Sequence, residues 1–451
     1  MAKKSQKILF LITMYFGTDG IRGAYGSAIM NESFTKKVGA AIGKYVNGKC
    51  KYTPTILVGR DTRPSGPSLQ YSLTEGLQSN GITVLDCGVI PTPALAFGTL
   101  HHQADFGVMI TASHNLFSDN GIKCFSSKGT KLSPEDEELI ETFIDHDYLS
   151  NSQNQKVEKL NLLESYREFI HSLFPKNNLE GLKIVLDLAN GATCHTTPQV
   201  LEEMGATIIC IHRGCGTIND QCGSEYLNSL QSTVLNNQAD LGIAHDGDGD
   251  RVRFVDSNGI TVNGDKILGI IALHAKSLKN LKSNTFISTI HSNSGLSSSL
   301  QKHEISCTQA TVGDRNVFLK MQELGANWGG ESSGHIIGLD YLPTGDGLIA
   351  ALMVLQAVKQ SKSNIRTIGD RITLWPAKSD SFFVEEKIPL NEIPSLSNAI
   401  DEEKRKAGIN GRILFRYSGT EKKARLLVEG KDEQWVNSAF DRICKVILET
   451  L

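Results

Sequence analysis

Three carboxylates stand at alternate positions in the stretch DGDGDR, which begins at Asp246 and continues through Asp248 and Asp250. The intervening glycines let the backbone fold tightly, so the carboxylates can converge on one hard cation. A calcium hand does not fit, because Arg251 stands where that loop needs glycine and Ser257 where it needs a bidentate glutamate. We therefore expect Mg²⁺, which keeps positions open for a phosphate oxygen.

A serine in the polar loop Thr111–Asn115 is a candidate nucleophile. The apolar run Val108–Ile110 predicts a short buried strand that ends just before the loop, and ligands of open α/β sheets bind at the carboxyl ends of strands. Ser, His and Asn are also ordinary turn formers, so a structural role for Ser113 stays open at this point. A GxSxG elbow is absent, which argues against acyl transfer.

Four loops that combine glycine with arginine could bind phosphate, although each could also be a turn with a structural arginine. The last of them joins the arginine fork of Arg416 to two hydroxyls, Ser418 and Thr420, and to the amide of Gly419. The loops are Gly17–Gly23, Gly59–Gly66, Val312–Arg315 and Arg416–Thr420.

The segment Glu331–His335, ESSGH, offers a carboxylate, two hydroxyls and an imidazole that could grip sugar hydroxyls. Isolated histidines are more often structural, so His101, His102 and His291 receive no role.

The chain of 451 residues is too long for one core, and about 150 residues per domain predicts three or four domains. A net charge of −3 gives no overall bias towards nucleic acid. The nine cysteines form no CxxC pair, which argues against a zinc site or a disulfide framework and favours a reducing cytoplasm. The apolar run Ile8–Ile12 is too short for a membrane span and lacks a cleavage site, so neither export nor a membrane anchor is expected.

The elements that position these residues follow a βα pattern over the first 145 residues, and a polar stretch at 151–159 is predicted to be a linker. Ser133 and Pro134 predict a helix start. Three segments end a helix with a left-handed glycine and enter a strand, at Gly81, Gly205 and Gly325, which suggests three related α/β units. After Trp375 the pattern changes to short strands, at 382–385, 412–415 and 426–428, and a final amphipathic helix.

The predicted fold class is α/β, with three similar mixed-sheet domains and a smaller C-terminal α+β domain around a central active-site cleft. The predicted boundaries assign 1–150 to the domain with the serine loop and 151–256 to the domain with the acidic loop. Residues 257–374 then carry the sugar-binding loop, and residues 375–451 carry the distal phosphate-binding loop.

Together these motifs resemble the α-D-phosphohexomutase superfamily, most closely its phosphoglucosamine mutase branch. The motifs, in family order, are FGTDGIRG at 16–23, TASHN at 111–115, NGIK at 120–123, DGDGDR at 246–251, GGESSGH at 329–335 and RYSGTE at 416–421. The chain departs from the branch at Leu116, Lys422, Tyr417, Ser332 and the loop Gly214–Asp220, without losing a charged or nucleophilic group.

The resemblance implies that Ser113 is carried as phosphoserine, with one Mg²⁺ per chain held by the three aspartates and a phosphoserine oxygen. Arg22, His114, Lys123 and His335 would lie near the transferred group, and the residue that acts as general base stays open. Substrate contacts are implied for Arg251, Glu331, Ser333, Arg416, Ser418, Gly419, Thr420 and Arg425.

The implied reaction interconverts glucosamine 6-phosphate and glucosamine 1-phosphate through a 1,6-bisphosphate, for UDP-N-acetylglucosamine and the cell wall. Glucosamine or glucose 1,6-bisphosphate would be the activator, and an unidentified kinase or bisphosphate donor would load Ser113. Alternatives are a phosphoglucomutase or phosphomannomutase, and a non-catalytic sugar-phosphate-binding protein. The expected partners are sugar phosphates, without nucleic acid or membrane; a homodimer is one option for the oligomeric state.

Overall fold

The computed structural model describes residues 15–17, 19–144, 157–418 and 422–451. The chain divides into two compact units. The first comprises Met1–His291 and Thr308–Asp370, and the second comprises Ser292–Cys307 and Arg371–Leu451. The predictions for Ile8–Ile12, Gly419 and Thr420 lie outside the described residues.

A six-stranded mixed sheet with the order β1-β5-β4-β2-β3-β6 opens the first unit. Strands β2, β3, β4 and β6 run parallel, and β1 and β5 are antiparallel to their neighbours. All five residues of β4 are buried, which fits a central strand covered on both faces. The strands are β1 (Ile21–Ala24), β2 (Thr55–Arg60), β3 (Thr83–Val89), β4 (Phe106–Ile110), β5 (Asp119–Ser126) and β6 (Val157–Lys159).

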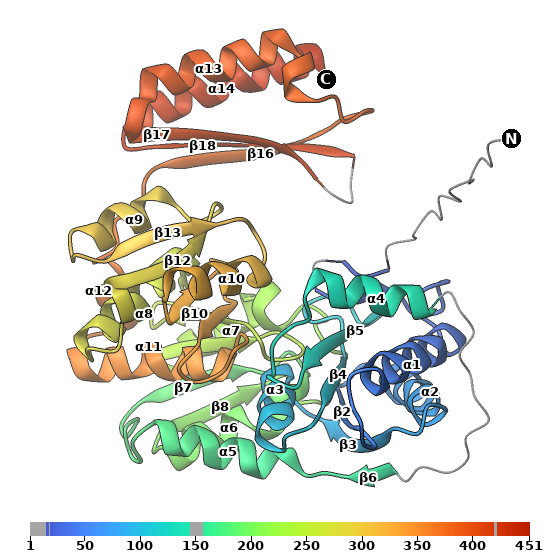
Figure 1. Ribbon diagram of the computed structural model, residues 1–451. Helices are drawn as coiled ribbons and strands as arrows, with labels where there is room; N and C mark the ends of the chain where they lie inside the picture. The colour runs from blue at the N-terminus through green and yellow to red at the C-terminus, as the bar shows by residue number, and fades with distance from the viewer. Residues whose placement is uncertain (1–14, 18, 145–156, 419–421) are drawn as a thin grey trace, which may run out of the picture. The chain divides into compact units, whose positions relative to one another are not determined.

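Helices α1 (Glu32–Asn47) and α2 (Gly66–Gln78) lie side by side against this sheet (Figure 1). Their close approach depends on glycine, because a Cβ at Gly76 would lie only 2.0 Å from the carbonyl oxygen of Lys36. Ser133 and Pro134 begin helix α4 (Pro134–Ile144) as predicted, and the Ser133 hydroxyl accepts a hydrogen bond from the Asp136 amide. Helix α3 spans Thr92–His101.

The predicted linker at 151–159 is wrong over its last three residues. Val157–Lys159 form strand β6, which pairs in parallel with β3. The polar sequence hides this strand because all three of its residues are exposed, as an edge strand permits.

A five-stranded sheet with the order β11-β10-β9-β7-β8 follows. Strands β7, β8 and β9 are parallel, whereas β9 and β10 form an antiparallel hairpin. The strands are β7 (Lys183–Asp187), β8 (Thr207–Ile211), β9 (Leu241–His245), β10 (Val252–Asp256) and β11 (Thr261–Val262). The associated helices are α5 (Leu162–Leu173), α6 (Thr197–Glu203) and α7 (Asn228–Asn237).

A four-stranded sheet with the order β13-β12-β14-β15 comes next. Its strands are β12 (Thr285–Thr289), β13 (Ser306–Ala310), β14 (Trp328–Gly330) and β15 (Ile336–Gly338). The helices of this region are α8 (Gly264–Ser277), α10 (Asp314–Leu324), α11 (Gly347–Ser361) and α12 (Ile365–Gly369).

The three glycines of the predicted repeat all adopt a left-handed backbone, with φ of +75° at Gly81, +95° at Gly205 and +63° at Gly325. In each case the amide of the next residue donates to the carbonyl five residues earlier, as in a Schellman cap. The local part of the repeat prediction is therefore confirmed.

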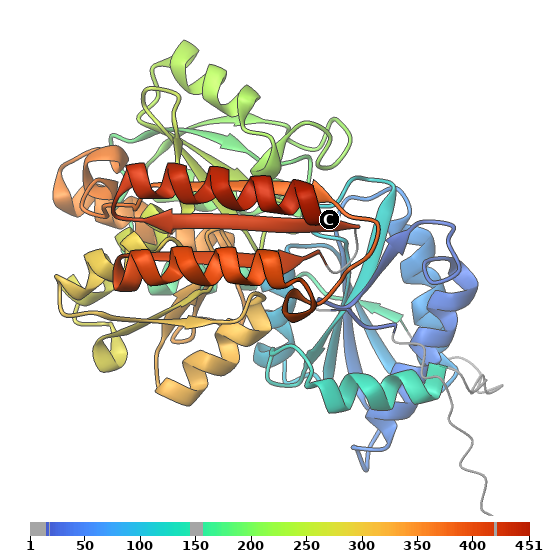
Figure 2. The same cartoon turned by 90° about the horizontal axis from the view of Figure 1, so that it is seen from above.

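The second unit contains a three-stranded antiparallel sheet with the order β16-β18-β17. Helices α13 and α14 run side by side on one face of it in both ribbon views (Figures 1 and 2). The predicted strand at 382–385 lies too late, because β16 ends at Phe383. The elements are α9 (Ser294–Gln301), β16 (Ala377–Phe383), α13 (Pro394–Ala407), β17 (Gly411–Tyr417), β18 (Lys423–Gly430) and α14 (Glu433–Thr450).

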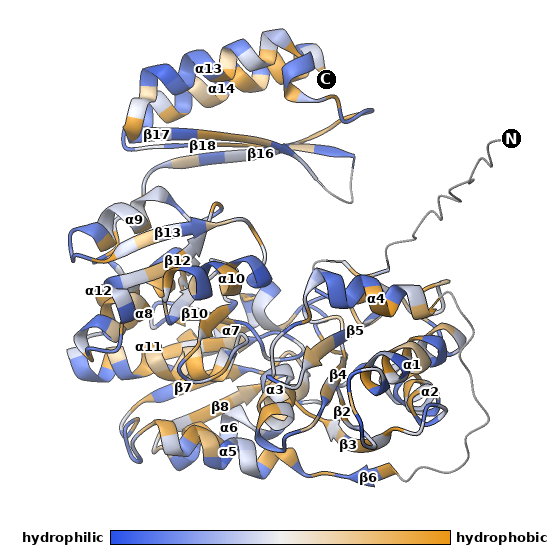
Figure 3. Ribbon diagram, in the orientation of Figure 1, coloured by the Kyte–Doolittle hydropathy of each residue, from blue (hydrophilic) through white to orange (hydrophobic). Residues whose placement is uncertain are grey.

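Hydropathy follows this layering, because the inner strands are mostly hydrophobic and the outer helix faces are polar (Figure 3). In the final helix Val436, Ile443 and Ile447 are buried as predicted, while Phe440 is only partly buried and Ala439 takes a core position.

Candidate functional site

Ser113 stands three residues beyond the end of β4, in the loop 111–118 that we call the serine loop, as the sequence predicts. Its side chain is buried, and its hydroxyl donates to Oδ2 of Asp246 over 2.6 Å. The backbone at Ser113 is left-handed, with φ of +54°, a conformation that costs free energy in a non-glycine residue. The loop therefore holds this hydroxyl in a specific place.

The acidic loop is the turn of the β9–β10 hairpin, in which His245 pairs with Val252. Asp246, Asp248 and Asp250 offer oxygens that lie within 4.8 Å of one another; we call these three residues the oxygen cluster. Gly247 lies against the serine loop, since a Cβ there would be 2.8 Å from the Ser113 carbonyl oxygen. A side chain at this position would push the two loops apart.

One buried lysine balances much of the acidic charge. The Lys123 ammonium on β5 lies 2.8 Å from Oδ2 of both Asp248 and Asp250, and 3.2 Å from Oδ2 of Asp19. Burial opposes the charge of Lys123, but the three carboxylates around it outweigh that effect and raise its pKa well above the ordinary value. Lys123 is therefore a permanent cation of the site at neutral pH.

The charge of Lys123 does not fully offset the negative charges of the oxygen cluster. Burial, together with the charges of Asp250 and Asp248, raises the pKa of Asp246 well above its ordinary value. Oδ1 of Asp248 and Oδ1 of Asp250 are buried and have no hydrogen-bond partner among the described residues. Because such orphaned oxygens are costly, the cluster fits a hard divalent cation.

The predicted phosphate role of the loop Gly59–Gly66 is wrong for Arg63. Arg63 is buried and forms an ion pair with Asp61 at 2.9 Å. Its guanidinium donates to the backbone carbonyls of Ser113, Asn115 and Leu116 in the serine loop and of Asp119 at the start of β5. Arg63 thus fixes the loop that carries the serine and offers no free face to a phosphate.

Two other predicted phosphate arginines are also engaged by carboxylates. Arg22, on β1, forms an ion pair with Asp19 and donates to the Ala112 carbonyl at 3.4 Å. Arg315 binds Glu137 through both terminal nitrogens. Each of these guanidinium groups is therefore paired with a carboxylate of the protein.

His114 and His335 both lie next to the site. Nδ1 of His114 is 3.4 Å from the Ser113 hydroxyl, and burial with the nearby Arg251 charge lowers the His114 pKa to about 4. His114 is therefore neutral at pH 7. Nε2 of His335 lies 3.4 Å from Asp314 and 3.8 Å from Asp250.

The ESSGH segment approaches the acidic loop through its backbone. Residues Arg251 and His335 form a β-bridge, and the Val252 amide donates to the Gly334 carbonyl. Glu331 and Ser333 are half-buried, and Oε1 of Glu331 accepts the Gly313 amide. The segment therefore reaches the edge of the oxygen cluster, as the resemblance implies.

In the second unit, Arg416 on β17 and Arg425 on β18 are directly opposite each other, and both are exposed. Two like charges in this position repel. Burial and the Arg425 charge lower the pKa of Arg416. An anion between the two guanidinium groups would relieve that repulsion. Ser418, two residues after Arg416, is buried.

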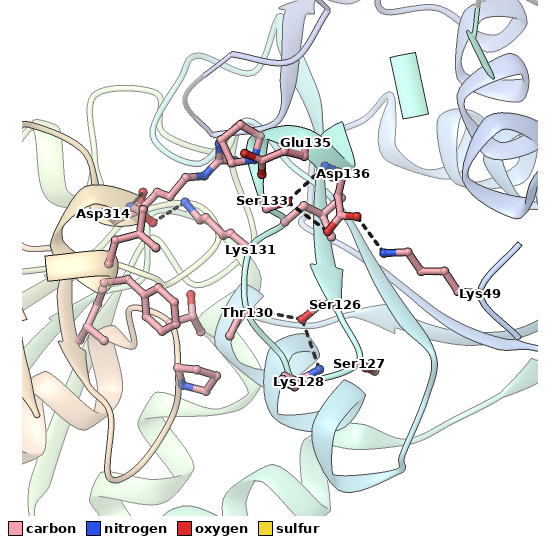
Figure 4. A pocket seen from close by; sticks show the side chains of 18 residues that line it. Lys49, Ser126, Ser127, Lys128, Thr130, Lys131, Ser133, Glu135, Asp136 and Asp314 are labelled. Carbon is pink, nitrogen blue, oxygen red and sulfur yellow. Dashed lines mark hydrogen bonds and ion pairs between the residues drawn. The ribbon is translucent and has the colours of Figure 1, made fainter. Parts of the chain in front are cut away.

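A cavity of about 720 Å³ borders the polar network at Lys131 and Asp314, which point towards each other in Figure 4. Lys131 also pairs with Asp19. Neither Ser113 nor the oxygen cluster lines this cavity, so it is a neighbour of the site rather than the site itself.

The sequence analysis missed several residues of the site. Thr92 donates to Oδ2 of Asp248 at 2.6 Å, and Asn219 donates to the Ser113 carbonyl at 2.7 Å. Asp19 lies within the quoted motif FGTDGIRG, which could have identified it, whereas Thr92 and Lys131 carry no local signal.

Four domain families match the chain in order. They are phosphoglucomutase/phosphomannomutase α/β/α domain I (residues 13–150), domain II (164–259), domain III (263–375) and the C-terminal domain (382–446).

Curated relatives match along almost the whole chain. Phosphoglucosamine mutase of Pseudoalteromonas translucida is 40% identical and covers 96% of this chain and 97% of its own. Phosphoglucosamine mutase of Actinobacillus pleuropneumoniae is 42% identical and covers 96% and 98%.

Solved structures share the fold. A phosphoglucomutase/phosphomannomutase family protein of Burkholderia thailandensis superposes with a TM-score of 0.79 at 21% identity, covering 96% of this chain and 97% of that one. An N-acetylphosphoglucosamine mutase of Aspergillus fumigatus gives 0.65 at 16% identity, covering 96% and 95%. With these matches over all four domains, the chain belongs to the phosphoglucomutase/phosphomannomutase family, in its phosphoglucosamine mutase branch.

Proposed function

We propose that this chain is an isomerase that interconverts glucosamine 6-phosphate and glucosamine 1-phosphate. The observation that carries the proposal is the buried Ser113 hydroxyl, 2.6 Å from the first aspartate of the oxygen cluster. The phosphoglucosamine mutases that are about 40% identical over the full chain support the choice of sugar.

The oxygen cluster would hold Mg²⁺ together with a phosphate oxygen on Ser113. The fit rests on the two orphaned carboxylate oxygens and on the mutual distances of the three side chains. When bound, the ion supplies positive charge that neutralises the phosphoryl oxygens during transfer. The Aspergillus fumigatus enzyme, whose structure contains GlcNAc-6P and magnesium, supports this assignment.

The reaction needs two phosphoryl transfers. In the first, the sugar O1 attacks the phosphorus on Ser113 and the P–Oγ bond breaks; O1 loses a proton and Oγ gains one, which gives the 1,6-bisphosphate and a free Ser113 hydroxyl. After the bisphosphate turns round, the Ser113 hydroxyl loses its proton and attacks the phosphorus on O6. The P–O6 bond breaks and O6 takes up a proton, which releases glucosamine 1-phosphate and restores the phosphoserine.

The main roles of the chain's own residues are to position the nucleophile and to neutralise the charge of the transferred phosphoryl group. Arg63 holds the serine loop by its carbonyls, so that the nucleophile needs little reorganisation. Lys123 stays protonated, as its raised pKa requires, and so serves as a fixed cation instead of a general base. Arg22 lies next to the loop through the Ala112 carbonyl and would stabilise the transferred group.

The remaining contacts concern the sugar and its second phosphate. Glu331 and Ser333 would bind sugar hydroxyls, and Arg251 would bind the substrate at the end of the acidic loop. Arg416 and Arg425 would bind the phosphate that is not being transferred, which their mutual repulsion supports. Ser113 would receive its first phosphoryl group from a kinase or from a sugar 1,6-bisphosphate, in the cytoplasm.

A coupled assay with glucosamine 6-phosphate, Mg²⁺ and glucose 1,6-bisphosphate tests the proposal. Ser113→Ala should lose at least about 10⁴-fold in turnover, since no phosphoryl relay remains. Ser127→Ala, which changes an exposed serine next to β5, is the matched control and should keep wild-type turnover. Equal turnover of the two variants would refute the role of Ser113.

Two alternatives give different results in the same assay. A phosphoglucomutase or phosphomannomutase would prefer glucose or mannose 6-phosphate by tenfold or more in kcat/KM. A non-catalytic sugar-phosphate-binding protein would show no turnover of any of the three sugars and no phosphate on Ser113 by mass spectrometry.

A further inference from the structure

Asp187, His212 and Cys222 form a second polar cluster, which we call the mixed cluster. Asp187 ends β7, His212 follows directly after the neighbouring parallel strand β8, and Cys222 precedes the 3₁₀ turn Gly223–Glu225. One potential ligand atom of each residue lies within 4.8 Å of the other two. The oxygen, nitrogen and sulfur of these side chains thus meet in one place.

A buried carboxylate oxygen of the mixed cluster has no partner in the protein. Asp187 is fully buried, and its Oδ1 accepts the Ala189 amide at 2.9 Å and lies 3.1 Å from Nδ1 of His212, with which it forms an ion pair when the imidazole is protonated. Its other oxygen, Oδ2, has no hydrogen-bond partner among the described residues. Such an oxygen is costly to bury, and a cation bound between the three side chains would satisfy it.

The types of ligand select the cation. Carboxylate, imidazole and thiolate together are typical ligands of Zn²⁺, whereas Mg²⁺ prefers oxygen alone. Tetrahedral bonds of 2.0–2.3 Å would place the ligand atoms about 3.3–3.8 Å apart. The ligand atoms of the mixed cluster lie within 4.8 Å of one another. His212 is partly exposed, so the cluster can be reached from solvent.

A second shell for such a site is already present. The Asn190 side chain donates weakly to the Cys222 sulfur at 3.9 Å, and its oxygen accepts the amides of Gly214 and Gly216. An amide donor that faces a thiolate stabilises its charge and orients it towards a metal. The loop between His212 and Cys222 is therefore fixed at both of its ends by the cluster.

We propose that Asp187, His212 and Cys222 form a binding site for Zn²⁺ that is separate from the oxygen cluster. Bound zinc would link the carboxyl ends of β7 and β8 to the loop that carries Asn219. Because Asn219 donates to the carbonyls of Ser113 and Asn115, this link would also stabilise the serine loop. The lack of a CxxC pair excluded zinc at the level of sequence only because these ligands come from separate segments.

Cobalt tests the site directly, because Co²⁺ replaces Zn²⁺ and shows a thiolate-to-cobalt charge-transfer band when cysteine is a ligand. The metal-free full-length chain, reduced with a phosphine, should develop this band with one equivalent of Co²⁺, and Zn²⁺ should abolish it. Cys222→Ser should remove the band. Cys215→Ser, which changes an exposed cysteine of the same loop, is the matched control and should retain it.

His212→Gln tests the nitrogen ligand at a partly exposed position where folding is not at risk, and it should weaken Co²⁺ binding by at least about 100-fold. The absence of a band in the wild type at millimolar Co²⁺ would overturn the proposal. So would a band that survives Cys222→Ser, or Co²⁺ binding of unchanged affinity in His212→Gln.

Discussion

The oxygen cluster follows strand β9, and Asp187 of the mixed cluster ends the neighbouring parallel strand β7. The two clusters differ in their ligand types and in their surrounding charge. Asp187 on β7 pairs in register with Ala244 on β9, two residues before Asp246. The oxygen cluster consists of carboxylates from one hairpin turn and is neutralised in part by Lys123. The mixed cluster combines three ligand types from three segments and contains no lysine or arginine.

This difference shows how two sites at the carboxyl ends of neighbouring strands can prefer different metal ions. A compact acidic turn with several open positions suits a hard ion that must also meet a phosphate. A buried carboxylate, imidazole and thiol suit a softer ion in a closed, structural site. The following predictions test whether the two clusters are as independent as their chemistry indicates.

Among the variants that compare the two clusters, Asp248→Asn should have the largest effect. It removes one charge and one buried acceptor from the oxygen cluster, so kcat/KM for glucosamine 6-phosphate should fall about 10²–10³-fold. The thiolate-to-cobalt band of the mixed cluster should stay unchanged. Asp401→Asn, an exposed carboxylate on α13, is the control. If the activity loss stays below tenfold, or the cobalt band changes, the separation of the two clusters is wrong.

Lys123→Met should destabilise the fold by at least about 3 kcal/mol, because it removes the ammonium that pairs with the buried carboxylates of Asp248 and Asp250. Urea unfolding at pH 7 with a chelator measures the effect, and Mg²⁺ should restore part of the loss. Lys128→Met, an exposed lysine after β5, should change little. A loss of less than about 1 kcal/mol would contradict the charge balance drawn above.

Asp346 is another buried carboxylate, and no lysine, arginine or histidine among the described residues forms an ion pair with it. It caps α11 by accepting the amides of Leu348 and Ile349, and it accepts the Tyr166 hydroxyl. Burial outweighs these hydrogen bonds and raises its pKa to about 6. Between the unfolded value near 3.9 and the folded value, the native state binds more protons than the unfolded state.

Stability should therefore fall as the pH rises from about 4 to 6, by about 2–3 kcal/mol from this group, and should level off above. Asp346→Asn, which keeps an N-cap residue, should lack this part of the pH dependence. Urea unfolding at pH 4.5 and pH 7 distinguishes the two proteins. Identical pH profiles would show that Asp346 is not responsible.

Asn219→Ala should have the smallest effect, because it removes two hydrogen bonds to the serine loop, at 2.7 and 2.9 Å. We expect a loss of about 1–2 kcal/mol in stability and a modest fall in kcat. Zn²⁺ should raise the melting temperature of both proteins but change turnover only in the wild type. Asn258→Ala, in an exposed turn, is the control. An equal effect of Zn²⁺ on turnover in both would break the proposed link.

Much of the fold follows from local patterns. Apolar runs predict β2, β4, β7 and β9 because buried parallel strands need continuous hydrophobic residues. The glycine at the end of each repeat is visible because only glycine adopts the left-handed backbone at little cost. Strand β6 escaped detection because its exposed, polar residues carry no such pattern.

Some residues of the candidate site are likewise predictable from local patterns, and others are not. The chemistry of Ser113, Asp246, Asp248 and Asp250 is readable from spacing and motif. The function of arginine is not, because a guanidinium in a glycine-rich loop serves a phosphate or a carbonyl equally well. Arg63 proves to be a buried clamp, and its partners come from residues about 50 positions later.

The sequence by itself predicted the α/β class, the family, the serine and the acidic turn, since each is carried by short motifs or local patterns of consecutive residues. Only the tertiary structure decided that Lys123 pairs with the acidic turn, that Thr92 donates to it, and that Asn219 donates to the serine loop. It also decided that Asp187, His212 and Cys222 meet. These contacts join residues 10 to more than 150 positions apart, and which of them form depends on how the sheets and loops pack, which no local pattern encodes.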